Sequence, residues 1–415
     1  MLNLGEGGRP REARGLPRWM APPAVAATLE LVWVLDSAFG DRVDSGSDVD
    51  SVRVEELATA LDLTSRIGAR VPSPVLQEEL GAGVTERFRT RFRQTGARMV
   101  GLEAVARRIS EMAAGAGMPA VFLKGMALLL QGSVTPGKRR SSDVDVLVPE
   151  AGARELQGLL MQAGWSALDT PEIEHQLQAL EHPSGLSIEV HKLISGVRLD
   201  AGGIASARFD DLEREQLLER LEGFPGRSFI PGQDLLVAHL LVHGLAQHGR
   251  SLSYPLLRMI ADLEDLALSE EQWRGFMAGP YTWIARDVTE DLAWAAWRLA
   301  RRLQAGEAGA LLVESSDEGT LLRHIVAGAL DHQYVQSLRI GSVLGALPAG
   351  NRWRKTAVTL FHAVWLTRGQ VDILYGRPKS ALGYAAWRAW RPFDLVVRGL
   401  RYARAWLHLR ARRQG

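Results

Sequence analysis

The chain has 415 residues, of which 46% are hydrophobic and 23% are charged, and its formal net charge is +1. This length predicts two or three folded domains, and the balanced charge excludes a strong global attraction to nucleic acid or to a membrane. There is no cysteine, which excludes disulfides, zinc–thiolate sites and cysteine nucleophiles and fits a cytoplasmic location. No apolar run reaches the roughly 18 residues of a membrane-spanning helix.

The first quarter of the chain is predicted to be helical after a flexible tail. Residues 1–20 are rich in Gly, Pro and Arg, a composition typical of mobile termini. Helical patterns follow over 23–63, broken near 39–50 by Gly and Asp, and again over 74–111, where apolar residues recur at helical spacing.

Short strands and helices then alternate in the middle of the chain. Periodicity and turn residues predict a strand at 120–123, a helix at 126–130, a basic loop at 132–142, a strand at 143–148, a helix at 151–163 and a strand at 186–193. Beyond residue 231 the pattern is again helical, with candidate helices at 233–247, 255–268, 283–303, 321–335, 353–374 and 381–409. We therefore expect an α+β fold with a small mixed sheet, flanked by N-terminal helices and a helical C-terminal domain.

The expected domain boundaries follow from these changes of pattern. They are a flexible tail at 1–20, an N-terminal helical region at 21–97, an α+β core at 98–230, and a helical C-terminal domain with a basic amphipathic tail at 231–415. In that tail arginines alternate with aromatic residues over 377–413. We favour packing of the aromatic side chains on the protein body over peripheral contact with an anionic membrane or binding of an acidic acceptor.

Two aspartates one residue apart are the most informative feature of the sequence. Asp143 and Asp145 alternate with buried-type valines in the strand at 143–148, so both carboxylates face the same side of the sheet. Two like charges this close repel unless a cation lies between them. Mg²⁺ is a hard cation that prefers carboxylate oxygens and phosphates, which predicts a magnesium site here.

The strand at 186–193 repeats this alternation. Its apolar residues face one side, whereas Ser187, Glu189 and His191 face the other. If this strand lies beside the first one, Glu189 supplies a third carboxylate to the same site. A second Asp-Val-Asp sequence, at 48–50, lies in a Ser/Gly/Asp cluster without a strand before it, and we interpret it as a solvated turn.

These segments resemble the nucleotidyltransferase superfamily, most closely its largely uncharacterised bacterial branch with a Leu-Lys-Gly motif. The resemblance covers about 121–265. It rests on Leu123-Lys124-Gly125, on Ser142-Asp143-Val144-Asp145, and on an acidic residue followed by histidine that looks like Glu189 and His191. Helical motifs further on are similar to Asp234, His239, His243 and His248 and to Arg258 and Asp262.

The resemblance implies an NTP with Mg²⁺ or Mn²⁺ and transfer of a nucleoside monophosphate. Asp143, Asp145 and Glu189 would be the catalytic metal ligands. Nucleotide binding is assigned to four residues around the glycine turn and the basic loop: Lys124, Gly125, Arg140 and Ser142. Gly125 permits close approach of the backbone to the triphosphate, and Lys124 offers a point charge where the wider superfamily has a serine.

Several roles stay open at this stage. Lys138, Arg139 and Arg140 all precede the Asp strand, and we place Arg140 best for phosphate contact because of its spacing from Asp143. His239 and His243 share one helix face, where packing is favoured over metal binding. His239, His243 or Asp262 is the candidate general base for an acceptor hydroxyl.

The predicted function is therefore transfer of a nucleoside monophosphate from an NTP to an acceptor, with release of pyrophosphate. The acceptor is a small molecule, a sugar, a peptide or a protein, and specific nucleic acid is not expected. Three rival interpretations are transfer of a different phosphorylated group, a catalytically inactive protein that binds a nucleotide or a partner, and a membrane-associated adaptor acting through the tail.

Overall fold

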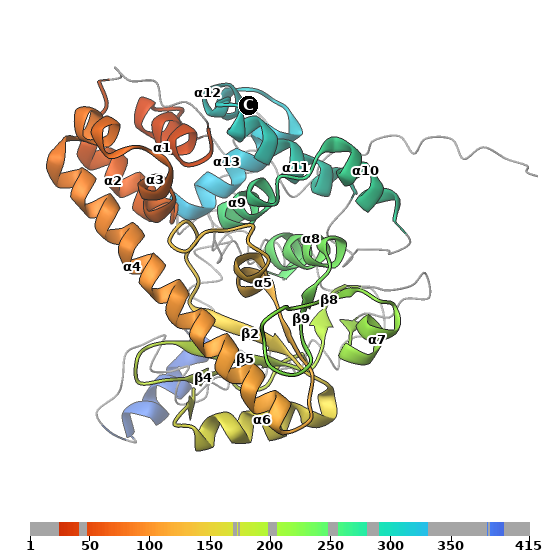
Figure 1. The fold of residues 1–415 in the computed structure, drawn as a ribbon. Coiled ribbons are helices and arrows are strands. Elements are labelled where there is room, and N and C mark those ends of the chain that lie inside the picture. Colours follow the sequence, from red (N-terminus) through yellow and green to blue (C-terminus); the bar gives the residue numbers. More distant parts are fainter. Residues whose placement is uncertain are drawn as a thin grey trace, which may run out of the picture.

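The structure of the protein is a computed structural model. It describes residues 25–40, 48–168, 172, 175–197, 206–247, 256–279, 290–330, 380 and 382–393. Figure 1 shows a helical part stacked on a sheet-containing part. The predicted tail at 1–20 and the predicted helix at 353–374 lie outside the described residues, as does most of the helix predicted at 381–409.

The helical part consists of two groups of helices, one that precedes the sheet in the chain and one that follows it. It contains α1 (Leu29–Phe39), α2 (Ser51–Ala60), α3 (Thr64–Arg70), α9 (Leu256–Leu266), α10 (Glu270–Ala278), α11 (Glu290–Gln304), α12 (Ala308–Val313) and α13 (Asp317–Leu330). Buried side chains from both groups form one hydrophobic cluster, which includes Leu35, Phe88, Trp273 and Leu322. The N-terminal and C-terminal helices therefore share a core.

The longest element, α4 (Ser73–Gly115), runs from the helical part down the side of the sheet (Figure 1). At Gly81 the backbone leaves the helical region, with φ 77° and ψ 163°, and the element bends there. Only glycine adopts such a positive φ without a steric cost. Asp50, part of the sequence interpreted as a turn, caps α2 by accepting hydrogen bonds from the backbone of Val52 and Arg53.

The sheet is mixed, as predicted. Its strand order is β3-β4-β5-β2-β1-β9-β8, with β1 (Ala120–Phe122), β2 (Asp143–Leu147), β3 (Ser166–Ala167), β4 (Leu180–Glu181), β5 (Ser187–His191), β8 (Leu218–Arg220) and β9 (Ser228–Pro231). β2 runs parallel to β5 and antiparallel to β1. Three helices connect these strands, α5 (Lys124–Leu130), α6 (Glu150–Gln162) and α7 (Phe209–Arg214), and β6 (Ile194–Ser195) pairs separately with β7 (Ser206–Ala207).

Alternation along the central strands divides their side chains between two hydrophobic clusters. Val144, Val146 and Val148 pack below the sheet with α4 and α6, as the valine spacing predicts. Leu147, on the same face as the aspartates, joins the cluster of the helical part. Both faces of β2 are therefore covered, and its two carboxylates lie where the sheet meets the helices.

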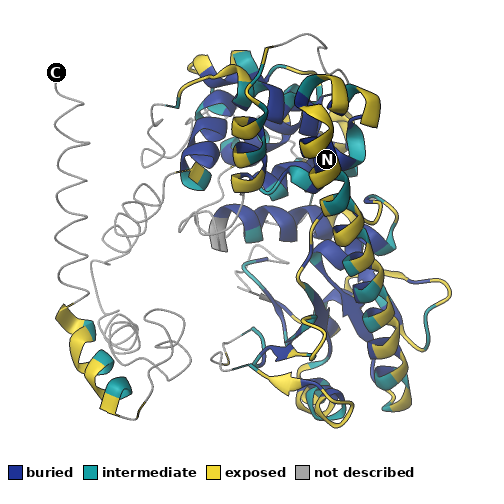
Figure 2. Ribbon diagram, turned by 90° about the vertical axis from the view of Figure 1, so that its left-hand side faces the viewer, coloured by how far each residue is buried: buried dark blue, intermediate teal, exposed yellow. Residues whose placement is uncertain are grey.

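Helix α8 (Gln233–Leu241) lies at this boundary. Every residue from Leu235 to Leu241 is buried, and Figure 2 shows α8 as a dark blue helix between the two parts. A helix that is apolar around its whole circumference is enclosed by protein on all sides. It continues as a π-helix, η1 (Val242–Gln247), within the helix predicted at 233–247.

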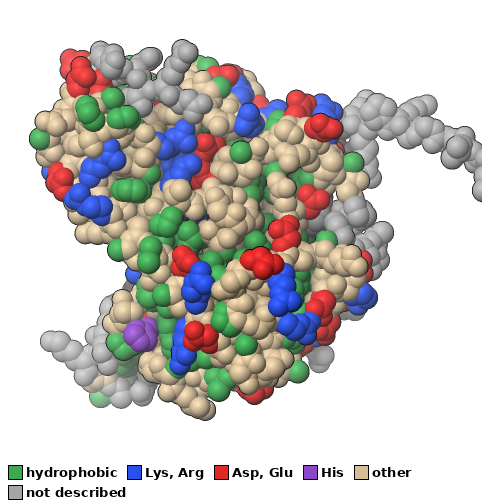
Figure 3. All heavy atoms as spheres, viewed as in Figure 1, with side chains coloured by type: hydrophobic (Ala, Val, Ile, Leu, Met, Phe, Trp, Pro, Cys, Tyr) green, Lys and Arg blue, Asp and Glu red, His purple; other side chains and the backbone are tan. Residues whose placement is uncertain are grey.

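The described part of the predicted basic tail is helical over 382–393. Leu382, Trp390 and Phe393 are exposed there, and the rings of Trp390 and Phe393 stack with their centroids 6.0 Å apart. No described helix is long and apolar enough to cross a membrane. On the face drawn in Figure 3, basic and acidic side chains are interspersed, in keeping with the net charge of +1.

Candidate active site

The fold brings most of the predicted site residues to one cavity. This cavity has a volume of about 560 Å³, which lies within the usual range for ligand pockets. One wall, which we call the carboxylate wall, consists of Asp143, Asp145, Glu189 and His191. The other, which we call the helical wall, consists of His239, Leu240, His243, Gly244, Met259 and Asp262.

The strand register places two of the predicted carboxylates side by side. Asp145 and Glu189 are Cα partners on the parallel strands β2 and β5, so the expectation that the second strand lies beside the first is confirmed. His191, two residues further along β5, reaches Asp145 with a distance of 2.8 Å between Nε2 and Oδ1. Its Nε2 is also 3.6 Å from Oε2 of Glu189.

These three residues form a candidate metal cluster. One ligand atom from each of Asp145, Glu189 and His191 lies within 4.8 Å of the others. Asp143 lines the same cavity but is not a member of this cluster among the described residues. The sequence therefore missed His191 as a ligand candidate, although its place in the period-two pattern of β5 put it on the correct face.

Lys124 provides a positive charge to the same carboxylate. Its Nζ donates a hydrogen bond to Oδ1 of Asp145 at 2.7 Å. The same oxygen of Asp145 therefore contacts both Lys124 and His191. The backbone of Lys124 has a positive φ of 49°, an uncommon conformation for a residue with a side chain. Such strained positions persist where the surrounding structure holds them, often at functional sites.

Burial and charge act in opposition on these groups. Burial alone would raise the pKa of Asp145, but the adjacent Lys124 and His191 hold that pKa well below its usual value. Burial would likewise lower the pKa of Lys124 and of His191, yet the carboxylates, Asp145 first among them, raise both above their usual values. The site therefore favours a carboxylate flanked by two cations.

Asp143 behaves differently from Asp145. Burial, together with the negative charges of Asp145 and Glu189, raises the pKa of Asp143 to about 6. Its neighbour Ser141 lies within 3.5 Å of Oδ1 through its hydroxyl. The two neighbouring acids disfavour ionisation of Asp143, and a bound cation would stabilise its charged form.

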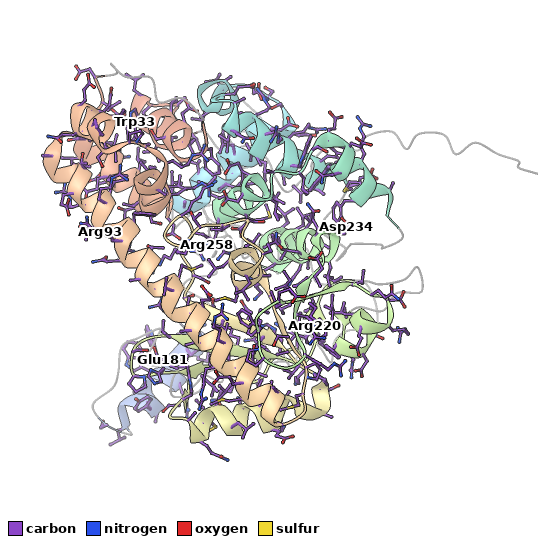
Figure 4. All side chains as sticks on the ribbon, in the orientation of Figure 1. Trp33, Arg93, Glu181, Arg220, Asp234 and Arg258 are labelled. Atoms are coloured by element: carbon purple, nitrogen blue, oxygen red, sulfur yellow. The ribbon has the colours of Figure 1, made fainter. Side chains whose placement is uncertain are left out.

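Each of the three cationic side chains in the basic loop pairs with a carboxylate of the helical part. Arg139 donates from Nε and Nη2 to the two oxygens of Asp262 on α9, at 2.6 and 3.0 Å. Lys138 pairs with Asp265 on α9. Arg140, which is half exposed, lies 3.4 Å from Asp62, which also pairs with Arg258; Figure 4 labels Arg258 at the boundary between the two parts.

Arg139, rather than Arg140, is therefore the loop arginine that lines the cavity. Gly125 makes room for it: a Cβ built on Gly125 would lie 2.1 Å from Nη1 of Arg139. The requirement for glycine at this turn thus comes from the arginine side chain as well as from the predicted approach of a triphosphate. Sequence spacing gave no signal for Arg139, because a loop has no period that fixes which side chain points inward.

The remaining predicted residues lie partly inside and partly outside the cavity. Ser142 is exposed and does not line it; its carbonyl accepts hydrogen bonds from Arg98 and Ser187. Asp234, labelled in Figure 4, is exposed in the first turn of α8, away from the lining residues. His239, His243 and Asp262 all line the cavity, whereas His248 lies outside the described residues.

The comparison with protein families decides the class to which this site belongs. A family described as uncharacterised nucleotidyltransferase matches residues 47–300, which is more than half of the chain. The chain belongs to this nucleotidyltransferase family. No curated protein matches it.

Membership confirms the resemblance found in the sequence and the expected enzyme class, a transferase of phosphorus-containing groups. The matched region contains α2 to α4, the whole sheet, α8 and α9, and so includes both walls of the cavity. The nucleotidyltransferase region and the cavity coincide, which makes this cavity the candidate active site.

Proposed function

We propose that the protein transfers a nucleoside monophosphate from an NTP to an acceptor in a reaction that requires Mg²⁺ or Mn²⁺ and releases pyrophosphate. The observation that carries the proposal is the cluster of Asp145, Glu189 and His191 beside Asp143, in the cavity of a nucleotidyltransferase. An acidic cluster on two paired strands suits a metal–nucleotide complex, whose own charge is negative on the phosphates and positive on the cation.

The donor set fits a divalent metal. Carboxylate oxygens are the ligands that Mg²⁺ and Mn²⁺ prefer, and an imidazole nitrogen is compatible with Mn²⁺. Asp143, Asp145 and Glu189 are the proposed ligands, with His191 as a further candidate. When bound, the cation supplies positive charge that orients the triphosphate and stabilises the charge that develops during transfer.

The other residues have proposed tasks that follow from their positions. Lys124 lies at the carboxylate wall with its Nζ on Asp145 and offers a point charge for a phosphate oxygen. Arg139 contributes a second fixed positive charge at the cavity, oriented by Asp262. Gly125 keeps the turn next to these two side chains small. Positioning and fixed charge together account for most catalysis in phosphoryl transfer.

The proposal is tested with NTPs labelled at the α- or at the γ-phosphate. Each is incubated with the protein, Mg²⁺ or Mn²⁺ and a small-molecule extract, and products are separated by mass. We expect the α-label to enter a product while the γ-label is released in pyrophosphate. Entry of the γ-label into a product would instead show phosphoryl transfer, and no transfer of either label by a folded protein that binds NTP would favour an inactive nucleotide-binding protein.

The matched variants are Asp145→Asn and Asp234→Asn. Both remove one negative charge, but Asp145 is in the cluster and Asp234 is exposed outside the cavity. We expect transfer to be lost in the first variant and retained in the second. Equal transfer by both variants would contradict the assignment of the site.

A further inference from the structure

The described helix of the basic tail, 382–393, presents an apolar face to solvent. Leu382, Trp390 and Phe393 are 83%, 51% and 64% exposed, although packing on the protein body would bury them. Figure 2 shows this helix at the lower left in yellow and teal, without a buried residue. Its other exposed positions, which together with these three form what we call the apolar face, are Ala385, Ala386, Ala389 and Pro392.

The apolar face occupies one side of the helix. Leu382, Ala389 and Phe393 are separated by seven and then four residues, which is the spacing that aligns side chains along one helix face. Arg388 and Arg391 are half-buried, and by the same spacing they lie on the other side. Within 382–393 the solvent-facing surface is therefore apolar and carries no charged side chain.

The aromatic residues of the apolar face lie together. The rings of Trp390 and Phe393 stack at a centroid distance of 6.0 Å with their planes 25° apart, so that both contribute to one patch. Single exposed apolar residues are normal on soluble proteins, whereas a contiguous apolar patch marks a site that binds a protein or a membrane. The apolar face is therefore a candidate docking surface.

Charge is distributed unevenly along the chain, and the apolar face lies in its most basic segment. Residues 377–413 contain ten Lys and Arg and one Asp, whereas the whole chain has 49 basic and 48 acidic residues. The rest of the chain is therefore net negative. A partner that complements this segment offers an apolar interior for the exposed face and negative charge around it, which is the chemistry of a membrane surface that contains anionic lipid.

Other partners fit the apolar face less well. Single-stranded nucleic acid is bound by rings and cations on the same surface, whereas this face carries no cation. A helix that binds in a protein groove uses large anchors in successive turns, but here only alanines are exposed between Leu382 and Trp390. Pairing of two copies through this face would bring two strongly basic segments together, which is unfavourable.

We propose that the segment 382–393 binds a membrane surface containing anionic lipid. Leu382, Trp390 and Phe393 insert at the boundary between headgroups and acyl chains, and the basic side chains of 377–413 are attracted to the lipid charges. Stable binding to a membrane surface commonly requires two such contributions, one apolar and one electrostatic. This docking surface is additional to the proposed nucleotidyl transfer and does not depend on it.

The first test is flotation of the full chain with vesicles of phosphatidylcholine alone or of phosphatidylcholine with phosphatidylserine. We expect flotation with the anionic vesicles, little with the neutral ones, and a loss at high salt because salt screens the attraction. Absence of flotation with anionic vesicles, or equal flotation with both kinds, would overturn the proposal. Binding of an RNA oligonucleotide in place of the vesicles would also overturn it and assign the segment to nucleic acid.

The second test compares two double variants that each remove two exposed apolar side chains. Trp390→Ser/Phe393→Ser changes the apolar face, whereas Val52→Ser/Val313→Ser changes side chains of the helical part that are 61% and 73% exposed. We expect the first variant to bind anionic vesicles at least about tenfold more weakly than the wild type, and the second to bind equally well. Undiminished binding by the first variant, or equal weakening in both, would overturn the assignment of the apolar face.

A conservative variant tests insertion itself. Trp390→Phe keeps an aromatic ring and should bind anionic vesicles like the wild type, but it should lose part of the tryptophan fluorescence that brominated lipid quenches. Unchanged quenching would show that Trp390 does not enter the lipid and would overturn its insertion. All of the substituted side chains are exposed, so thermal unfolding without vesicles should be the same in each variant and in the wild type.

Discussion

Asp145 and Glu189 lie opposite each other as register partners on the parallel strands β2 and β5, at the boundary between the sheet and the helices. The chain between them passes through α6 and the antiparallel strands β3 and β4, and it then returns beside β2 as β5. Two acidic groups brought together in this way require positive charge nearby. Lys124 and His191 supply it from within the chain.

Replacing Asp145 with Asn should lower stability as well as metal binding. The change leaves Lys124 and His191, both buried, without their shared carboxylate. Removing one partner of a buried ion pair costs about 3–5 kcal/mol. Urea unfolding without metal measures this loss, with Asp234→Asn as the surface control, and unchanged stability of Asp145→Asn would contradict the role of Asp145 as a counter-charge.

Replacing Asp143 with Asn should raise the stability of the metal-free protein at neutral pH. The pKa of Asp143 is raised from 3.8 to about 6, so its ionisation destabilises the fold above pH 6 and has no effect below pH 3.8. The gain is at most about 3 kcal/mol, from a shift of about two pKa units. It should appear in unfolding curves at pH 7.5 and vanish near pH 3; an equal difference at both values would show that the charge of Asp143 is not responsible.

Replacing Gly125 with Ala should displace Arg139 from Asp262. The new methyl group would overlap the guanidinium, and overpacking of this kind costs about 1–3 kcal/mol. Gly158 in α6 is the control, because a Cβ there meets nothing within 4 Å and Gly→Ala within a helix stabilises by roughly 0.5–1 kcal/mol. The melting temperatures should therefore move in opposite directions, and a fall of similar size in both variants would point to a general effect.

The two adjacent arginines of the basic loop should respond differently to replacement by Gln. Arg139→Gln leaves the buried Asp262 without its partner, a change that costs about 3–5 kcal/mol. Arg140→Gln breaks an exposed pair with Asp62, which contributes about 1 kcal/mol or less. Unfolding free energies and NTP binding of the two variants check this order. A larger effect of Arg140→Gln on NTP binding would restore the sequence-based assignment of Arg140 to the phosphates.

The central strands were predictable because their pattern is strong. Valines alternate with aspartates in β2, and apolar residues alternate with Ser187, Glu189 and His191 in β5, so one face of each strand follows from a period of two. The mixed sheet and the flanking helices were predicted for the same reason. The pairing of β2 with β5 was stated only as a condition, since strand order depends on contacts far apart in the chain.

Other elements left too weak a pattern to be predicted. The strands β3, β4, β8 and β9 have two to four residues each, too few to show alternation. The π-helix after α8 differs from an α-helix in its hydrogen bonds, which apolar spacing does not reveal. The choice between Arg139 and Arg140 depended on Asp262, a partner 123 residues away.

The most direct test of the central claim is calorimetric binding of the four NTPs, each with Mg²⁺, to the wild type and to the Asp143→Asn/Asp145→Asn double variant. The Asp234→Asn protein is the control, since its exposed carboxylate lies outside the cavity. The account predicts that the wild type binds at least one NTP in a metal-dependent manner and that the double variant binds it about 100-fold more weakly. Losses of metal affinity on this scale follow mutations around metal sites. Binding of wild-type strength by a folded double variant would contradict it.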